Sequence, residues 1–299
     1  MVWLDRLGVE DSLDPAPVAW LRGAAPSAAA AMSRRHAAHK GSFGDVAVVG
    51  GAEGMVGAAI LAGRAAHAAG AGRVYVVPLS GASAPDHDPV RPELMFRPAW
   101  CDASAPNTIA STTVVCGCGG GDAVRAPLSR LLSLARRLVL DADALNAVAA
   151  DRGLRAATTL RASRHLLTVL TPHPLEAARL LDSSTAEVQA DRLGAARELA
   201  ARYGSIVVLK GSGSVIAAPG VVPVINATGT GALATAGTGD VLAGWIGGRW
   251  SPALAEATLE LAFETVAGAV GEHGAAVEPA HAGPMRAADL VEALHRRLA

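Results

Sequence analysis

The 299-residue sequence contains few aromatic side chains and no long apolar run. Aromatic residues make up 3% of the chain while hydrophobic residues make up 51%, so we expect a core built mainly from alanine, valine and leucine. No run approaches the roughly 18–20 uninterrupted apolar residues that a membrane-spanning helix needs. The N-terminus lacks a basic segment followed by an apolar one, which argues against export. We therefore expect no membrane partner.

An excess of charge of either sign is also absent. The formal net charge is -1 and the sequence pI is about 6.8, so we expect no basic surface for nucleic acid. The three cysteines, Cys101, Cys116 and Cys118, form neither an even disulfide framework nor a zinc-type C-x-x-C pair. These features predict a reduced, cytoplasmic protein.

Lysine is almost missing from the chain. Of the 26 basic residues only Lys40 and Lys210 are lysines, and each stands directly before a glycine. The compact ammonium group of lysine and the planar guanidinium group of arginine are not interchangeable at a crowded phosphate site. The two lysines therefore indicate a candidate phosphate or ribose site, although chance placement of two residues gives the same pattern.

Strand and helix patterns alternate along most of the chain. A short apolar strand at 46–49 runs into glycines, an alanine-rich helical pattern follows at 55–69, and a second strand follows at 73–77. Such a strand–helix–strand unit is typical of a parallel sheet. Further strands are expected at 112–116, 137–140, 166–170, 206–209 and 215–217, and further helices at 127–134, 187–203, 241–249, 253–271 and 287–298.

This alternation predicts one α/β domain, a three-layer α/β/α sandwich with a central, mostly parallel sheet. The domain is expected over residues 36–299. Residues 1–35 are rich in alanine and proline, and we expect a loosely ordered N-terminal arm there, with at most one short helix.

Glycine and polar clusters follow the expected strands. In open parallel sheets, ligands bind beyond the carboxyl ends of the strands, where such clusters gather. The clusters are 50–51, 117–121, 141–146, 171–176 and 210–214. Because all five clusters follow expected strands, they predict a single site at the carboxyl edge of the sheet.

A further loop of small residues, 234–239, ends at Asp240 and leads into an apolar helix pattern. Glycines and a helix N-terminus can direct backbone N–H groups at a phosphoryl group, and Asp240 can accept a proton from an attacking hydroxyl. The same pattern is also typical of an ordinary glycine-rich turn, in which Asp240 stabilises the helix dipole.

Ordinary structural roles remain open for the other polar residues. Asp141 and Asp143 are compatible with a helix N-cap and a first-turn acid. His173, between two prolines, is compatible with a stiffened turn. The segment 210–214 is compatible with a hairpin turn, because a strand pattern resumes after it.

Together these segments carry a family resemblance. They occur in the order 40–44, 48–51 with 55–59, 70–72, 140–146, 170–174 with Glu176, 208–211, and 237–242. The set resembles the ADP/ATP-dependent NAD(P)H-hydrate dehydratase family of the ribokinase-like superfamily, over roughly residues 36–298. The resemblance implies a stand-alone dehydratase domain with the ribokinase-like fold.

The resemblance also implies an activity. NADHX and NADPHX are nicotinamide cofactors hydrated across a ring double bond, and the family restores NADH and NADPH from them with ADP or ATP as phosphoryl donor. It implies Mg²⁺ held largely by the donor phosphates and water, with no protein ligand assigned. It further implies a homotetramer, with the epimerase activity on a separate chain.

Matching motif by motif assigns the site residues. The resemblance makes Asp240 the acid–base residue. Residues implied for the hydrated cofactor are Ala59, Gly119, Gly121, Asp141, Asp143, Asn146, His173 and Asp240. Residues implied for the adenine nucleotide and its phosphates are Lys210, Gly211, Ser212, Gly213, Ser214, Gly237, Thr238 and Gly239. Asp141, Asp143 and Asn146 match either the nicotinamide half or the metal–phosphate region, and this choice stays open.

The sequence departs from the family pattern at four positions. Ala236 and Leu175 stand where glycines are usual, Cys118 where a proline is usual and Ala243 where a threonine is frequent. If position 236 needs a positive φ, alanine costs about 1 kcal/mol there. Two other functions stay open: a small-molecule kinase of the same superfamily that stops at the phosphate ester, and a dinucleotide-binding protein without turnover.

Overall fold

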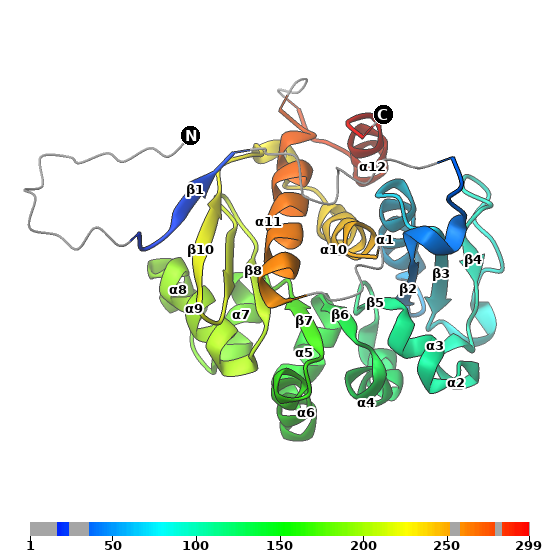
Figure 1. Cartoon of the computed structure of the whole chain (residues 1–299), viewed down its shortest axis with the longest axis horizontal. Coiled ribbons are helices and arrows are strands. Elements are labelled where there is room, and N and C mark those ends of the chain that lie inside the picture. The colour runs from blue at the N-terminus through cyan, green and yellow to red at the C-terminus, as the bar shows by residue number, and fades with distance from the viewer. Residues whose placement is uncertain (1–16, 24–35, 252–257, 279–282, 299) are drawn as a thin grey trace, which may run out of the picture.

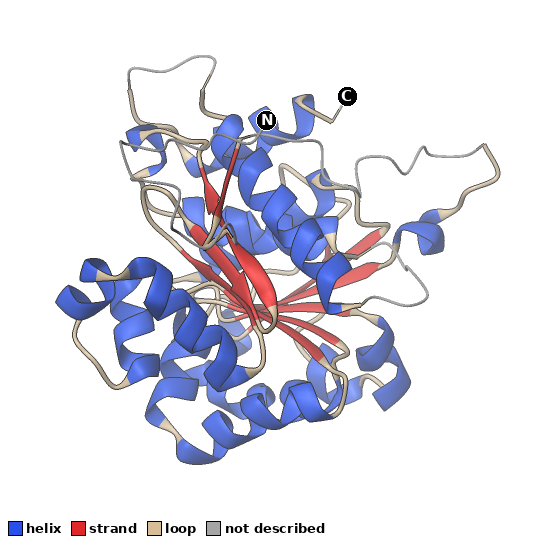
Figure 2. Ribbon diagram, turned by 60° about the vertical axis from the view of Figure 1, so that its left-hand side comes forward, coloured by secondary structure: helices blue, strands red, loops and turns tan. Residues whose placement is uncertain are grey.

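The computed structural model describes residues 17–23, 36–251, 258–278 and 283–298. In this part of the chain ten strands form one sheet in the order β1-β10-β9-β8-β7-β6-β5-β2-β3-β4. Helices cover both faces of the sheet (Figures 1 and 2), which confirms the three-layer α/β/α sandwich. No helix in these residues is long and apolar enough to cross a membrane.

The strands are β1 (Trp20–Arg22), β2 (Asp45–Gly50), β3 (Arg73–Pro78), β4 (Met95–Phe96), β5 (Thr113–Cys116), β6 (Arg137–Leu140), β7 (Leu167–Leu170), β8 (Ile206–Leu209), β9 (Val215–Ala218) and β10 (Val221–Asn226). The helices are α1 (Val56–Ala68), α2 (Trp100–Ala103), α3 (Pro106–Ser111), α4 (Arg125–Leu134), α5 (Ala142–Ala150), α6 (Arg152–Ser163), α7 (Pro174–Leu181), α8 (Thr185–Ala190), α9 (Arg192–Tyr203), α10 (Thr238–Arg249), α11 (Leu259–Ala275) and α12 (Ala287–Arg296).

The sheet is parallel from β4 to β8 and ends in an antiparallel hairpin of β8 and β9, continued by β10. Strand β2 lies between β3 and β5, so the chain moves outward on one side of β2 and then returns to its other side. Such a reversal of strand order leaves a crevice at the carboxyl ends of the two central strands.

Two apolar cores lie on the two faces of the sheet, and strand β2 contributes to both. Val46 and Val48 belong to the core beneath α1, α10, α11 and α12, while Ala47 and Val49 belong to the core beneath α4 to α9. This alternation follows from the two-residue period of a strand. Valine, alanine and leucine dominate both cores, as the scarcity of aromatic residues predicts.

Helices α1 and α10 pack with their backbones in contact. A Cβ atom at Gly244 would lie 2.0 Å from the carbonyl oxygen of Ala62, and one at Gly248 would lie 2.4 Å from that of Ala66. Glycines spaced four residues apart on one helix thus face alanines with the same spacing on the other. This contact lets α10 run through the middle of its layer, between α1 and α11 (Figure 1).

Three expected helices differ from the structure in their limits. The helix expected at 187–203 is two helices, because the Asp191 side chain accepts a hydrogen bond from the N–H of Gly194 and starts α9 afresh (2.8 Å). Helix α10 begins three residues before the expected position 241, at Thr238. Part of the helix expected at 253–271 lies outside the described residues, and its described part, α11, continues to Ala275.

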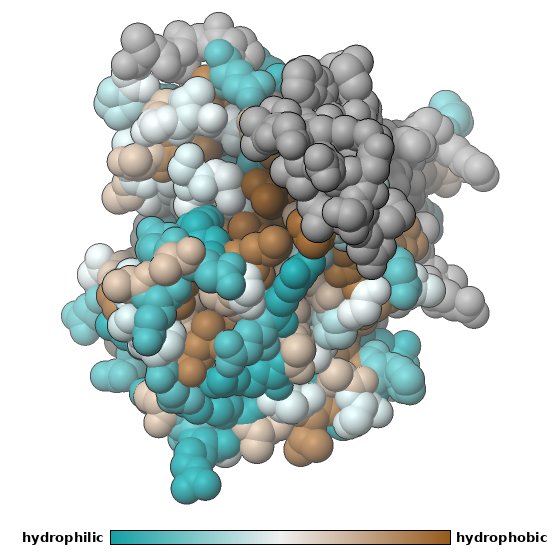
Figure 3. Space-filling view, turned by 90° about the vertical axis from the view of Figure 1, so that its left-hand side faces the viewer, coloured by the Kyte–Doolittle hydropathy of each residue, from teal (hydrophilic) through white to brown (hydrophobic). Residues whose placement is uncertain are grey.

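The described part of the N-terminal arm, residues 17–23, contains strand β1, and the short helix allowed for in the arm stays a prediction for residues outside the described part. Trp20–Arg22 pairs in parallel with β10, and Arg22 forms an ion pair with Glu264 of α11 (2.7 Å). The exposed Val18 and Leu21 lie at this edge. Figure 3 shows the molecule from that side, with hydrophobic residues next to a largely hydrophilic surface. The rest of the arm lies outside the described residues, and the domain boundary at 35/36 stays a prediction.

Gly244→Ala should lower the free energy of unfolding by about 1–3 kcal/mol, because the added methyl group cannot fit between the two helix backbones. Urea unfolding measures this difference. The matched control is Gly57→Ala in α1, where a Cβ would meet nothing within 4 Å and where alanine favours the helix by up to about 1 kcal/mol. Equal effects of the two substitutions would contradict the proposed helix contact.

Candidate active site

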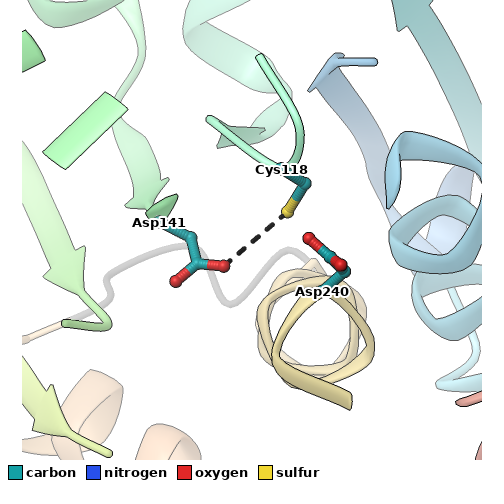
Figure 4. A group of neighbouring side chains, drawn as sticks. All are labelled: Cys118, Asp141 and Asp240. Carbon is teal, nitrogen blue, oxygen red and sulfur yellow. Dashed lines mark hydrogen bonds between the residues drawn. The ribbon is translucent and has the colours of Figure 1, made fainter. Parts of the chain in front are cut away.

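The clusters expected at the strand ends meet at the crevice beside β2 and β5. The loop after β5 lies against the loop after β2, since Gly51 N–H donates to Cys118 O (2.9 Å) and Ala52 N–H donates to Gly119 O (2.7 Å). The first turn of α10 brings Asp240 to the same place. Figure 4 shows the side chains of Cys118, Asp141 and Asp240 pointing toward one another from three different elements.

Glycines allow the loop after β5 to pass so close. Gly117 has a φ of 123°, and a Cβ there would lie 1.8 Å from the carbonyl oxygen of Asp141. Gly119 has a φ of 57°, and its Cβ would lie 2.8 Å from the carbonyl oxygen of Met55. Both glycines are therefore required by backbone shape, whatever they contact in a ligand.

Asp141 is the centre of a buried polar network. Its side chain is 2% exposed, and its Oδ1 accepts hydrogen bonds from Lys210 Nζ (2.6 Å) and from Thr171 Oγ1 (2.7 Å). Asp141 occupies the N-cap position of α5, but its side chain makes no capping hydrogen bond. The side chain of Asp141 therefore does not cap the helix, which is the ordinary role that the sequence left open.

Lys210 brings a positive charge to the first turn of α10. Burial lowers the pKa of its ammonium group, but the carboxylates of Asp141 and Glu176 outweigh burial, and the pKa lies above its usual value. Its Nζ lies 3.6 Å from the position that a Cβ on Gly239 would take. Lys40, in contrast, is exposed and precedes β2, at the opposite end of the sheet. Only one of the two lysines belongs to the site.

Asp240 is half-buried and titrates near neutrality. Burial raises the pKa of its carboxyl group to about 6, and the nearby charge of Asp141 acts in the same direction, while Cys118 and Lys210 lower it. A carboxylate with this pKa is ionised at neutral pH and is a stronger base than an ordinary aspartate.

The loop before α10 leaves several N–H groups without a helical partner. The first α-helical hydrogen bond joins Val241 N–H to Gly237 O, so the N–H groups of Thr238, Gly239 and Asp240 have no acceptor within the helix. Gly237 has a φ of 89°, whereas Ala236 is not among the described residues with positive φ. The departure from glycine at position 236 therefore costs no backbone strain.

A cavity of about 410 Å³ lies beside this turn, on the side of the β8–β9 hairpin. Seven of the eight residues assigned to the nucleotide line it: Lys210, Gly211, Ser212, Gly213, Ser214, Thr238 and Gly239. Gly237 is not a lining residue. The hairpin expected at 210–214 is present, so the structural and the binding roles coincide. Leu233, Leu242 and Val270 give the cavity apolar walls.

Sequence reasoning missed two parts of this cavity. One is the segment 228–231, where Gly229-Thr230-Gly231 repeats the Gly-Thr-Gly pattern of 237–239 and was a usable signal. The other is the end of α11, where His273 and Gly274 line the cavity. His273 Nε2 lies 3.0 Å from Thr238 O, and burial lowers the pKa of the imidazole to about 4. The neutral ring therefore donates from Nε2 to the first turn of α10.

His173 caps α7. Its Nδ1 accepts hydrogen bonds from the N–H groups of Leu175 (3.1 Å) and Glu176 (3.3 Å), and Glu176 Oε2 accepts one from His173 N–H (2.8 Å). This is a capping box with histidine as the N-cap. The structural role that the sequence left open is therefore present, and Nε2 of the half-exposed ring lies 3.2 Å from Glu176 Oε1. Leu175, which stands where the family usually has glycine, is exposed.

The remaining assigned residues lie at different depths. Asp143 accepts a hydrogen bond from Gly121 N–H (2.8 Å) and holds the loop after β5. Asn146 Oδ1 accepts one from Arg179 (2.7 Å) on α7, farther from Asp240 along α5. Ala59 is 0% exposed and packs behind Gly51, so the structure does not bring it to the surface of the site.

Solved structures share this architecture. A ribokinase-like superfamily protein from Enterococcus faecalis superposes with a TM-score of 0.72 and 24% identity, covering 89% of this chain and 90% of the other. The ADP/ATP-dependent NAD(P)H-hydrate dehydratase of Bacillus subtilis, co-crystallised with ATP and Mg²⁺, superposes with a TM-score of 0.71 and 30% identity, covering 89% and 94%. The fold is thus the ribokinase-like α/β fold, as expected.

Sequence comparison narrows the class further. A profile described as NAD(P)H-hydrate dehydratase matches residues 46–296. The ADP-dependent (S)-NAD(P)H-hydrate dehydratase of Neisseria meningitidis is 38% identical over 255 residues, which cover 82% of this chain and 80% of that protein. The chain belongs to the NAD(P)H-hydrate dehydratase family, and the resemblance inferred from its motifs is confirmed. It also matches a bifunctional NAD(P)H-hydrate repair enzyme of Coxiella burnetii at 38% identity, spanning about half (49%) of that protein.

Glu176→Gln should make the free energy of unfolding depend less on pH between about pH 5 and 8. Burial raises the pKa of the Glu176 carboxyl group to about 7. A carboxyl group with a raised pKa in the folded state stabilises the fold at low pH, and this contribution is lost as pH rises through about 7. Wild type should therefore lose stability over this range relative to the variant, by up to about 3 kcal/mol.

Urea unfolding at several pH values measures this difference. The control is Glu187→Gln, because Glu187 has the same position in the capping box of α8 but is exposed, with its pKa lowered by the Ser184 hydrogen bonds. Parallel stability curves for wild type and Glu176→Gln would contradict the raised pKa.

Proposed function

We propose that this protein dehydrates (6S)-NADHX and (6S)-NADPHX to NADH and NADPH, with ADP or ATP as phosphoryl donor. The observation that carries the proposal is the position of Asp240. This carboxylate, with a pKa of about 6, lies in the first turn of α10 beside Asp141. The adjacent Thr238 and Gly239, together with Lys210, line the cavity of about 410 Å³. Family membership supplies the substrate, and the geometry supplies the roles of the residues.

The first chemical step is a phosphoryl transfer. Asp240 accepts the proton of the C6 hydroxyl of the hydrated ring as its oxygen attacks the terminal phosphorus of the donor. One P–O bond forms to the substrate and one breaks to the departing AMP or ADP. A hydroxide ion is a poor leaving group, and this step converts it into phosphate, which is a good one.

The α10 turn and Lys210 stabilise the transferred phosphoryl group. The N–H groups of Thr238, Gly239 and Asp240 have no helical acceptors, and they lie at the positive end of the helix dipole. The Lys210 ammonium adds a full charge next to Gly239. The adenine nucleotide occupies the cavity between the β8–β9 hairpin and the end of α11, so its phosphates point toward Lys210.

The second step restores the nicotinamide. The lone pair of the ring nitrogen forms a double bond to C6 as the C6–O bond breaks and phosphate leaves. Loss of a proton from C5 then re-forms the ring double bond. Ester formation alone would describe a small-molecule kinase, so phosphate release distinguishes this proposal from its closest competitor.

The carboxylates of the site fit a magnesium ion bound to the donor phosphates. Mg²⁺ prefers oxygen ligands, and Asp141 and Asp240 present carboxylate oxygens within 4.8 Å of each other. Burial is the main cause of the raised pKa of Asp240, and a cation would relieve the repulsion from Asp141 that adds to it. When bound, Mg²⁺ neutralises charge on the donor phosphates. Family relatives support this cofactor, since the Bacillus subtilis structure was co-crystallised with ATP and Mg²⁺.

The hydrated dinucleotide is assigned to the opposite side of Asp240. His173, Asp143, Asn146 and the glycines of the loop after β5 are assigned to this ligand, and Asp143 accepts a hydrogen bond from Gly121 N–H of that loop. The half-exposed imidazole of His173 offers a polar edge there. A homotetramer, an epimerase on a separate chain and a cytoplasmic location complete the proposal and stay predictions from the family.

Asp240→Asn should lower kcat about 10²–10⁴-fold, because the amide cannot accept the hydroxyl proton. The assay mixes the protein with NADHX, Mg²⁺ and ADP or ATP, and follows both the NADH absorbance band and released phosphate. ADP binding by calorimetry should stay within about threefold of wild type. The control is Asp122→Asn, which changes a fully exposed carboxylate in the segment after β5. Wild-type turnover by Asp240→Asn would remove this residue from the mechanism.

The pH dependence of kcat/KM provides a separate test. Activity should fall about tenfold per pH unit below pH 6, since Asp240 must be ionised to act as a base and its pKa is about 6. It should level off above pH 7, because the raised pKa of Lys210 keeps the ammonium charged. Initial rates between pH 5 and 8 in a constant-ionic-strength buffer measure the profile. A flat profile from pH 5 to 7 would contradict the assignment.

A further inference from the structure

The mechanism leaves one buried group at the site without a role, the thiol of Cys118. Its side chain is 0% exposed and lies between the two carboxylates in Figure 4. Cys118 Sγ, a carboxylate oxygen of Asp141 and one of Asp240 all lie within 4.8 Å of one another. Neither phosphoryl transfer nor phosphate loss needs a thiol at this position.

The two oxygens of Asp141 face different partners. Oδ1 is already occupied by Lys210 and Thr171, while Oδ2 faces Cys118 Sγ at 3.9 Å. In a tetrahedral zinc site, with Zn–S of about 2.3 Å and Zn–O of about 2.0 Å, neighbouring sulfur and oxygen ligands lie about 3.5 Å apart. The spacing of Sγ and Oδ2 therefore needs little adjustment to hold one ion.

We propose that Cys118, Asp141 and Asp240 form an inhibitory binding site for a thiophilic divalent cation such as Zn²⁺. The ion takes one ligand from each side chain, with water in the fourth position. The ion coordinates the carboxylate of Asp240, which then cannot accept the proton of the substrate hydroxyl, and so it blocks turnover. The inhibition rests on the proposed function, whereas the binding rests on the geometry alone.

The chemistry of the three ligands selects the ion. A thiolate is a soft ligand that suits Zn²⁺, Co²⁺ and Cd²⁺, while Mg²⁺ prefers oxygen. Binding replaces the thiol proton by the metal: Cys–SH and M²⁺ give Cys–S–M⁺ and H⁺. Burial and the charges of Asp240 and Asp141 hold the pKa of the Cys118 thiol well above its usual value, so the free protein carries that proton. The net uptake of one M²⁺ therefore releases one proton.

Lys210 limits the affinity of this site. Its ammonium lies 2.6 Å from Asp141 Oδ1 and repels a cation on Oδ2. A site with two carboxylates, one thiolate and a neighbouring cation should bind more weakly than a structural zinc site with four protein ligands. Reversible inhibition by free metal is the expected behaviour, not permanent occupancy.

The binding test uses Co²⁺ alone, with the full chain and no nucleotide. Co²⁺ bound to a thiolate gives a near-ultraviolet charge-transfer band, which reports the sulfur ligand directly. One equivalent should produce the band and release one proton into a weakly buffered solution. The band should disappear in Cys118→Ala, and Asp240→Asn should weaken Co²⁺ binding at least tenfold. Cys101→Ala, which changes a buried thiol elsewhere, should behave as wild type.

The inhibition test adds Zn²⁺, at free concentrations set by a metal buffer, to the NADHX assay. Each variant is compared with its own uninhibited rate. The inhibitory concentration should rise at least tenfold in Cys118→Ala and stay unchanged in Cys101→Ala, and a chelator should restore the wild-type rate. Absence of the cobalt band, its persistence in Cys118→Ala, or equal zinc inhibition of the two variants would overturn the proposal. A protein that binds Co²⁺ through Cys118 but turns over no NADHX would overturn the proposed function and leave the metal site standing.

Discussion

The contact between α1 and α10 is the constraint on which the site depends. Gly244 and Gly248 lie against the backbone of Ala62 and Ala66, so α10 approaches α1 as closely as two helices can. This proximity directs the first turn of α10 at the crevice beside β2, where the strand order reverses. Because the helix is nearly all buried, it cannot shift without opening a core. The proposed base, Asp240, and the N–H groups proposed to bind phosphate are thereby fixed on one rigid element.

The charges of the site are unequal in number, and this imbalance adds to the effect of burial on the pKa values of its carboxyl groups. Among the described residues there, Asp141, Asp240 and Glu176 share the single ammonium of Lys210, which hydrogen-bonds only Asp141. The two carboxyl groups without that bond have raised pKa values, about 6 for Asp240 and about 7 for Glu176. An unbalanced acidic site is suited to a magnesium ion on the donor phosphates and to accepting a proton. Together with the Cys118 thiol, the same carboxylates form the proposed site for an inhibitory metal ion.

Much of this arrangement was predictable from the sequence, for identifiable reasons. Strand β2 and helix α1 have strong periodicity, and glycines mark their ends, so their limits were found within a residue or two. The break at Asp191 was missed, because the alanine-rich pattern continues across it and a single capping side chain decides the matter. Helices α5 to α7 were also missed: α5 and α7 are short, α6 follows α5 after the single residue Asp151, and only the strand between α6 and α7 had a clear pattern. His273 escaped notice because only folding brings it to the nucleotide cavity, whereas the signal in residues 228–231 was overlooked.

By itself the sequence determined the alternation of strands and helices, the glycine loops at the strand ends and the family of the protein, because these depend on local spacing. It also marked Lys210 and Asp240 as chemically important. Only the tertiary structure decided that Lys210 pairs with Asp141, 69 residues away along the chain, and that Lys40 lies at the other end of the sheet. It likewise placed the Cys118 thiol between two carboxylates. Such neighbours are set by the packing of layers, and no local pattern encodes a distance across a sheet.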